Sequence, residues 1–266
     1  MSDLNNPVLL KSDGPISRII FNRPKVLNAL DMEAAQGFLE ACRSVASDPN
    51  NRVVVVAGEG RAFMAGGDIS VFTDSPSLYE VSAHVRALIE PLHEGLEILT
   101  SLPRPVIASL HGAVACAGWS IALATDLAIA ADNAIFTLAY SKLGTSLDGS
   151  SSWSLPRLVG LRKAMEIAML SDTYEASEAL RLGLVNRLVP AADLADETDR
   201  LARRLAEGPT FAYGKIKALL RDSSNNTLRR QLIAEADAFG ECANTEDFAE
   251  GVTAFLSKRA AKFSGA

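Results

Sequence analysis

Short runs of β-branched residues alternate with amphipathic segments through the first half of the chain. In the segment that follows Asp31, apolar residues recur at spacings of three and four, which gathers them on one helix face directed at a core. The segment over 82–100 repeats this pattern and ends at two closely spaced prolines. Strands are predicted at 16–21 (ISRIIF), 53–57 (VVVVA) and 106–110 (VIASL). This alternation predicts an α/β fold.

The second half of the chain becomes increasingly helical. Two short core strands are predicted at 127–130 (LAIA) and 135–138 (IFTL), on either side of an Asp-Asn turn. From Arg162 the pattern is helical with one β-like break at 184–189 (LVNRLV), and from Leu194 it is helical throughout. Polar breaks at GPT, DSSNN and NTED divide this tail into four predicted helices. Such a tail is expected to pack on the core or on a neighbouring subunit.

Residues 105–125 carry no Asp, Glu, Lys or Arg over nearly the length that spans a membrane. Pro105, Gly112 and Gly118 interrupt the segment, and most of its apolar residues are alanine. We therefore predict a buried strand joined tightly to a buried helix, and no membrane association.

Composition narrows the class of protein further. The 266 residues are 48% apolar and 22% charged, with 26 Lys and Arg against 32 Asp and Glu, so the net charge is −6. The basic residues form no stripe, which disfavours nucleic acid as a partner. Cys42, Cys116 and Cys242 are far apart in the sequence and suggest neither a disulfide framework nor a metal motif. We expect a cytoplasmic protein, and residues 1–15 lack the features of a signal peptide.

Two glycine-containing segments are candidates for ligand contact. Residues 63–68 (FMAGGD) follow a predicted strand and leave the amides of Gly66 and Gly67 free, although a plain tight turn would look the same. Residues 111–118 (HGAVACAG) lead into a helix that starts near Ala117, whose first amides have no partner within the helix. The two amide clusters could converge as an oxyanion hole. The alternative for the second is a small-residue helix packed closely on a strand.

Taken together, these segments resemble the crotonase (enoyl-CoA hydratase/isomerase) superfamily. The matching strings follow one another in order from about residue 16 to 260: NRPKVLNAL, RAFMAGGDI, RPVIASLHG, LPRLVGLRKAMEIAML, EALRLGLVNRLVP and EDFAEGVTAFLSKR. The resemblance implies a spiral of β-β-α turns over 1–193 and a helical trimerisation region over 194–266. It also implies a homotrimer or a dimer of trimers that acts on acyl-CoA thioesters, with no cofactor beyond the CoA of the substrate.

The resemblance also implies roles for individual residues. The thioester oxygen would receive the backbone amides of Gly67 and Ala117, the latter replacing the middle of a common glycine triplet. The residues expected along CoA are Lys25, Leu27, Ala65, Asp68 and Ile69, joined by Phe255 and Lys258 from a neighbouring subunit. Lys25 and Lys258 are also plausible as solvated surface charges.

Two departures from the hydratase pattern bear on the reaction. Hydratases of this family carry two glutamates at the positions of Ser120 and Tyr140. Adding water across a double bond needs one group to activate the water and one to deliver a proton, and neither side chain replaces a carboxylate at neutral pH. The sequence therefore disfavours a two-glutamate hydratase.

Asp148 and His93 are the remaining candidates for acid-base or nucleophilic chemistry. In resembling isomerases an Asp at the position of Asp148 is the acid/base, and in the dehalogenase branch it is the nucleophile. Asp148 could equally cap the helix expected from about Ser150. His93 matches the water-activating histidine of the 4-chlorobenzoyl-CoA dehalogenase branch, where an aromatic residue also stands at the position of Tyr140. It could equally be a partly buried surface histidine.

The preferred hypothesis is an enoyl-CoA isomerase that moves a double bond from the 3,4 to the 2,3 position. Asp148 would be its single base, with a pKa raised by an apolar pocket, and Tyr140 would orient the acyl chain or donate a hydrogen bond. The alternatives are a dehalogenase that uses Asp148 and His93, and an acyl-CoA binder without activity. His84 and His111 are expected to be structural, and no residues suggest a metal site.

Overall fold

The structure is a computed structural model that describes residues 6–69 and 77–265. Its largest element is a six-stranded sheet in the order β1-β2-β3-β4-β6-β9, in which β1 and β2 are antiparallel and the other pairs parallel. The strands are β1 (Val8–Asp13), β2 (Ile16–Phe21), β3 (Val53–Gly58), β4 (Val106–Leu110), β6 (Leu127–Ala131) and β9 (Arg187–Val189).

A second, three-stranded sheet lies beside the first. It consists of β5 (Ala113–Ala115), β7 (Ile135–Thr137) and β8 (Tyr174–Glu175) in the order β5-β7-β8. The chain passes from a strand of the large sheet to a strand of the small one and then into a helix, as in β4, β5 and α4 (Ala117–Ala124). This is the predicted spiral of β-β-α turns, so the expected fold class is confirmed.

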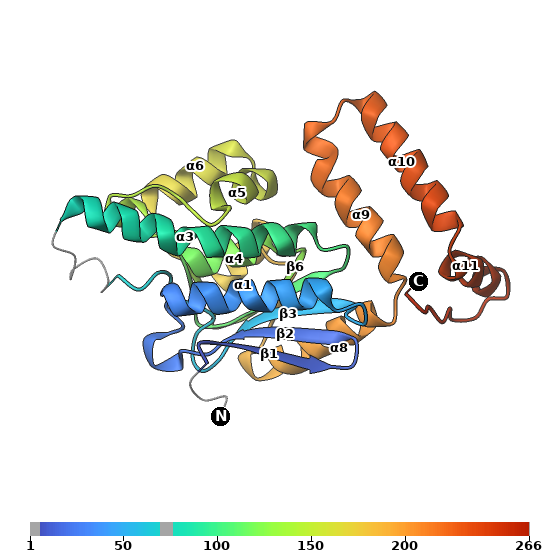
Figure 1. Ribbon diagram of the computed structural model, residues 1–266, viewed down its shortest axis with the longest axis horizontal. Helices are drawn as coiled ribbons and strands as arrows, with labels where there is room; N and C mark the ends of the chain where they lie inside the picture. The colour runs from blue at the N-terminus through green and yellow to red at the C-terminus, as the bar shows by residue number, and fades with distance from the viewer. Residues whose placement is uncertain (1–5, 70–76, 266) are drawn as a thin grey trace.

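Helices cover both faces of the large sheet (Figure 1). Val54 and Val56 of β3 belong to the core formed with α1 (Met32–Ser47) and α3 (Leu78–Ser101). Val53 and Val55 belong to a second core, formed with α8 (Leu194–Ala206). The run VVVVA is continuously apolar because β3 is buried on both faces.

Local signals set where several helices begin. The Asp31 side chain accepts a hydrogen bond from Ala34 N at 2.9 Å and caps α1, and Thr245 caps α11 (Glu246–Leu256) in the same way at 3.1 Å. The remaining helices of the spiral region are α5 (Ser151–Val159), α6 (Leu161–Leu170) and α7 (Ala176–Arg181).

The end of the chain extends away from the core as an arm made of α9 (Thr210–Asp222), α10 (Leu228–Ala243) and α11 (Figure 1). With α8, these are the four helices that the polar breaks predict. An ion-pair network joins α9 to the core: Lys217 Nζ and Arg221 Nη2 lie 2.8 and 2.7 Å from the carboxylate of Asp126. The division of the chain into a spiral region over 1–193 and a helical region over 194–266 stays a prediction. In the structure α8 packs on the sheet, and α9–α11 form the arm.

Residues 105–125 form β4, β5 and α4, as the strand-and-helix interpretation predicts, with one additional strand. No helix in the described part of the chain combines the length and the apolar character needed to cross a membrane. Three strands carry no clear sequence signal: β1 is a mostly exposed edge strand, β5 is only AVA, and β8 is only YE. The predicted strand over 184–189 is shorter, since only 187–189 pair with β6.

Candidate active site

The two glycine-containing segments, 63–68 and 111–118, are joined by backbone hydrogen bonds. Met64 N donates to Ala113 O at 3.0 Å, and Ala115 N donates to Met64 O at 2.8 Å. A Cβ on Gly118 would lie 2.6 Å from both Cβ and the carbonyl oxygen of Met64, so the close contact of α4 with this loop requires glycine. The segments that carry Gly67 and Ala117 are therefore held together, as the oxyanion-hole hypothesis needs.

The amides of Gly67 and Ala117 are available to a ligand. Ala117 is the first residue of α4, so its N–H has no partner within the helix, and the Cys116 side chain makes no capping bond. Among the described residues, neither amide donates a hydrogen bond. A Cβ built on Gly67 would meet no atom of the described residues within 4 Å, so they leave open space beside it. Two free amides of this kind can stabilise an oxyanion.

Asp148 lies close to α4, on the loop before α5. The Tyr140 hydroxyl donates a hydrogen bond to Asp148 Oδ1. Ser120 Oγ lies 3.1 Å from the Asp148 carbonyl oxygen, to which it donates, and 3.2 Å from Tyr140 Oη. Because Ser120 is one helical turn beyond Ala117, these contacts attach Asp148 to the helix that carries the second free amide.

The environment of Asp148 favours the protonated carboxyl. Burial raises its pKa, while the Tyr140 hydrogen bond and the nearby His93 oppose the rise. Burial and the Asp148 charge both raise the pKa of Tyr140, so the phenol stays protonated and remains the donor. A carboxyl in this setting is suited to accept a proton and return it.

His93 of α3 lies on the other side of the same loop. Gly149 N donates to His93 Nε2 at 3.2 Å, so the lone pair on this nitrogen is occupied. Gly149 has φ +56°, and a Cβ there would lie 2.9 Å from Ser120 Cβ. Glycine at this position lets the Asp148 loop fit between α3 and α4.

The helix-cap hypothesis for Asp148 is wrong. Helix α5 begins at Ser151, its N-cap is Ser150, and the Ser150 side chain makes no capping bond. Asp148 contributes only its main-chain carbonyl, which accepts from Ser151 N at 3.1 Å and Ser151 Oγ at 2.7 Å. Its carboxyl is directed instead toward Tyr140.

Five of the residues expected along CoA, namely Lys25, Leu27, Ala65, Asp68 and Ile69, lie on two loops that are joined by backbone hydrogen bonds. Ala65 N donates to Leu27 O at 2.9 Å, Lys25 is exposed one turn earlier, and Ile69 is 57% exposed. Asp68 Oδ2 lies 3.5 Å from a guanidinium nitrogen of Arg23.

Arg23 and the buried Asn28 organise these two loops, and the sequence reasoning missed both. Asn28 Nδ2 lies 2.8–3.1 Å from the carbonyl oxygens of Glu59, Ala62 and Phe63. The string NRPKVLNAL contains both residues, but an asparagine looks the same in sequence whether it is buried or exposed.

Phe255 and Lys258 are not brought to the other candidates within one chain. Phe255 is on α11, where it lines a pocket with Pro209 and Phe211 at the start of α9, and Lys258 follows α11. Phe255 is 83% exposed, and Lys258 is also exposed. Their predicted place at the site of a neighbouring subunit stays a prediction.

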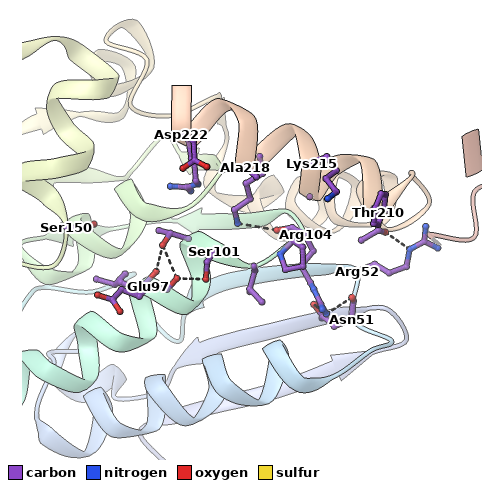
Figure 2. Close-up of a pocket in the computed structure, with 18 of the residues that line it drawn as sticks. Asn51, Arg52, Glu97, Ser101, Arg104, Ser150, Thr210, Lys215, Ala218 and Asp222 are labelled. Atoms are coloured by element: carbon purple, nitrogen blue, oxygen red, sulfur yellow. Dashed lines mark hydrogen bonds between the residues drawn. The ribbon is translucent and has the colours of Figure 1, made fainter. Parts of the chain in front are cut away.

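A cavity of about 1330 Å³ lies between the core and the arm, and Asp148 and His93 line one part of it. Figure 2 shows α9 on one side, with Lys215, Ala218 and Asp222, and α3 on the other, with Glu97 and Ser101. Nearer Asp148, the lining includes Leu96, Leu147 and Trp153. The candidate base therefore borders open space whose lining mixes apolar and charged residues, and neither Gly67 nor Ala117 is among the described residues that line it.

His84 is on the partly exposed first half of α3, and His111 Nε2 lies 2.9 Å from Gly60 O. Within the described ranges, no group of three or more His, Cys, Asp or Glu is arranged to hold a metal ion.

Known proteins resemble this chain over nearly its whole length. The model of the enoyl-CoA hydratase/isomerase family matches residues 11–266. The 1,2-epoxyphenylacetyl-CoA isomerase of Escherichia coli (strain K12) is 36% identical over 252 residues, 94% of this chain and 95% of that protein. The 4-chlorobenzoyl coenzyme A dehalogenase-2 of Arthrobacter sp is 33% identical over 247 residues, 93% and 89% of the two chains.

A solved structure agrees with these sequence matches. An enoyl-CoA hydratase from Polaromonas sp. JS666 has a TM-score of 0.88 and 36% identity, covering 96% of this chain and 99% of that one. The spiral fold and these matches thus define a family of enzymes that act on acyl-CoA thioesters. The chain belongs to the enoyl-CoA hydratase/isomerase family, and the resemblance found in the sequence is confirmed.

Proposed function

We propose that this protein is an enoyl-CoA isomerase that converts 3-enoyl-CoA to 2-enoyl-CoA, with Asp148 as its single acid/base. The carboxylate takes a proton from C2, and the electron pair of that C–H bond delocalises over the thioester and the 3,4 double bond as a dienolate. The amides of Gly67 and Ala117 stabilise the thioester oxygen, each by about 3 kcal/mol in the transition state. Asp148 then returns the proton at C4, which leaves the double bond at C2–C3.

The observation that carries this proposal is the placement of one half-buried carboxyl close to α4, whose first amide is free. A 1,3 proton shift needs one base, because the same group accepts and returns the proton. Burial raises the pKa of Asp148, which makes its carboxylate a stronger base. Hydration would require two such groups. The two positions at which hydratases carry glutamates hold Ser120, which is neutral, and Tyr140, which is a protonated donor.

Dehalogenation is the second candidate, because a 4-chlorobenzoyl-CoA dehalogenase is among the relatives. Asp148 would attack the ring carbon that bears chlorine, and His93 would activate water to hydrolyse the aryl ester. His93 Nε2 accepts the Gly149 N–H, however, so this nitrogen has no free lone pair to take a proton from water. The isomerase needs nothing from His93, and we prefer it for this reason. An acyl-CoA binder without activity would show no turnover at all.

We also propose that the protein works as a homotrimer or a dimer of trimers, in which Phe255 and Lys258 approach the CoA bound to a neighbouring subunit. The exposed arm supports this arrangement. Light scattering of the purified protein would contradict it by giving the mass of a monomer.

A substrate panel with wild type and His93→Gln tests the proposed reaction. On 3-enoyl-CoA, we expect the absorbance of the conjugated 2-enoyl thioester to rise with both proteins. On 4-chlorobenzoyl-CoA, we expect no chloride release. Chloride release that requires His93 would make the protein a dehalogenase. Loss of 2-enoyl absorbance through hydration, faster than isomerisation, would make it a hydratase.

A further inference from the structure

Ser120, Tyr140 and Asp148 make three polar contacts with one another, and among the described residues Asp148 supplies the only carboxylate in this set. The Asp148 carbonyl oxygen also accepts from Ser151 N and Ser151 Oγ. Tyr140 Oη contacts Asp148 Oδ1, Tyr140 Oη lies 3.2 Å from Ser120 Oγ, and Ser120 Oγ lies 3.1 Å from the Asp148 carbonyl oxygen. Ser120 has no exposed surface, and Tyr140 is buried. Asp148 is thus held at both its side chain and its main chain.

A hydrogen bond needs one proton, so the protons in this set can be counted. When Asp148 is ionised, the only protons are those of the two hydroxyls, while there are three contacts. Tyr140 donates to the charged carboxylate, which is the strongest acceptor present. The Ser120 proton can then serve its contact with Tyr140 or its contact with the carbonyl, and one contact is left without a proton.

When Asp148 is protonated on Oδ1, the count matches. Asp148 donates to Tyr140, Tyr140 donates to Ser120, and Ser120 donates to the Asp148 carbonyl, so every contact is a hydrogen bond. Each buried hydroxyl then both donates and accepts, and buried polar groups are most stable when fully paired. Tyr140 alone favours the ionised carboxylate, whereas Ser120 favours the protonated one.

We propose that Ser120 and Tyr140 are positioning residues for Asp148: in the ionised form Tyr140 occupies Oδ1 and leaves Oδ2 to exchange the proton with substrate, and in the resting protein Ser120 fixes the loop and supports the acid protonated on Oδ1. Within the described residues, Oδ2 has no hydrogen-bond partner, in keeping with this division between the two oxygens. The inference rests on the proposed function for what the proton exchange achieves, but its geometric part does not depend on it.

The other titratable groups that face Asp148 come from two helices and are common to every variant used below. His93 approaches from α3 and opposes the rise in the pKa of Asp148. Cys116 approaches from the start of α4, and burial raises the pKa of its thiol, which therefore carries no charge at neutral pH. Neither contacts the Ser120 or Tyr140 hydroxyl through any hydrogen bond between described residues.

The test is a ¹³C NMR titration of the Asp148 carboxyl in the full-length protein without substrate, with the signal identified by its absence in Asp148→Asn. The variants are Tyr140→Phe and Ser120→Ala, each of which removes a single hydroxyl. Ser154→Ala is the matched control, because Ser154 is a buried serine of α5 that contacts Ser150 and not Asp148. Thermal unfolding of each variant checks that the fold is kept.

Tyr140→Phe and Ser120→Ala should shift the midpoint of the Asp148 titration in opposite directions. Tyr140→Phe removes the donor to the carboxylate and should raise the Asp148 pKa by about one unit. Ser120→Ala removes the acceptor that completes the protonated ring and should lower it by about half a unit. Shifts of the same sign, or shifts no larger than that of Ser154→Ala, would overturn the inference.

Failure of this inference can be told apart from failure of the proposed function. The titration uses no substrate, so opposite shifts in a protein that does not isomerise 3-enoyl-CoA would keep the inference and refute the reaction. Isomerisation in a protein whose variants show no opposite shifts would do the reverse.

Discussion

Replacing Gly118 by alanine tests whether the tight contact between α4 and the Met64 loop holds the two free amides together. A Cβ at Gly118 would lie 2.6 Å from Met64 Cβ and 2.6 Å from Met64 O. Met64 cannot retreat easily, because its N–H and carbonyl are bonded to Ala113 and Ala115. The new methyl group must therefore push α4 away from the loop.

The expected magnitude comes from two opposing effects. In an ordinary helix interior, alanine in place of glycine stabilises by about 1 kcal/mol. Overpacking a closed contact costs about 1–3 kcal/mol, and contact with backbone atoms favours the upper end. Gly118→Ala should thus lower the free energy of unfolding by about 2 kcal/mol. Displacement of the Ala117 amide should also lower kcat by about a hundredfold.

Gly240→Ala is the matched control. Gly240 is in the interior of α10, and a Cβ there would meet nothing within 4 Å. The free energy of unfolding of this variant should rise by about 1 kcal/mol, and its kcat should be unchanged. Urea unfolding and steady-state rates on 3-enoyl-CoA measure both quantities. A Gly118→Ala protein as stable and as active as Gly240→Ala would refute the argument from close packing.

Three further predictions follow from buried polar groups. Burial raises the pKa of Asp148 in the native protein above the pKa of the same group in the unfolded chain. Ionising Asp148 as the pH rises from the lower of these pKa values through the higher one therefore lowers the free energy of unfolding. Asp148→Asn should therefore unfold at a higher temperature than wild type at about pH 8, and the difference should vanish near about pH 4. Lys217→Ala leaves Asp126 without one of its two cations and should cost about 3 kcal/mol in urea unfolding, whereas no loss would show that the network does not anchor the arm. Asn28→Ala leaves buried carbonyls without a donor and should lose about 3 kcal/mol; a loss below about 1 kcal/mol would contradict its bridging role.

The sequence predicts the fold well where one principle decides the outcome. The run VVVVA is a strand buried on both faces, and the apolar spacing after Asp31 is a helix with that residue as its cap. Edge strand β1 was missed because pairing with β2, and not an apolar face, makes it a strand. Its residues carry little of the signal that burial leaves in a sequence.

The candidate site was harder to predict because its contacts join residues far apart in the chain. Asp148 was expected from the family resemblance, and the choice between base and cap required the position of its carboxyl. Ser120 looked like a missing glutamate, and its contacts with Tyr140 and Asp148 depend on Gly149 lying against α4. No local pattern encodes contacts that span 20–28 residues.

The central claim is that Asp148 is the single base of a 1,3 proton shift. The direct measurement is the steady-state rate of 2-enoyl thioester formation from 3-enoyl-CoA by wild type and Asp148→Asn. We expect a loss of about a thousandfold in kcat with little change in KM, because the amide keeps the shape of the site and cannot take the proton. An Asp148→Asn enzyme that keeps kcat within about tenfold of wild type would contradict it.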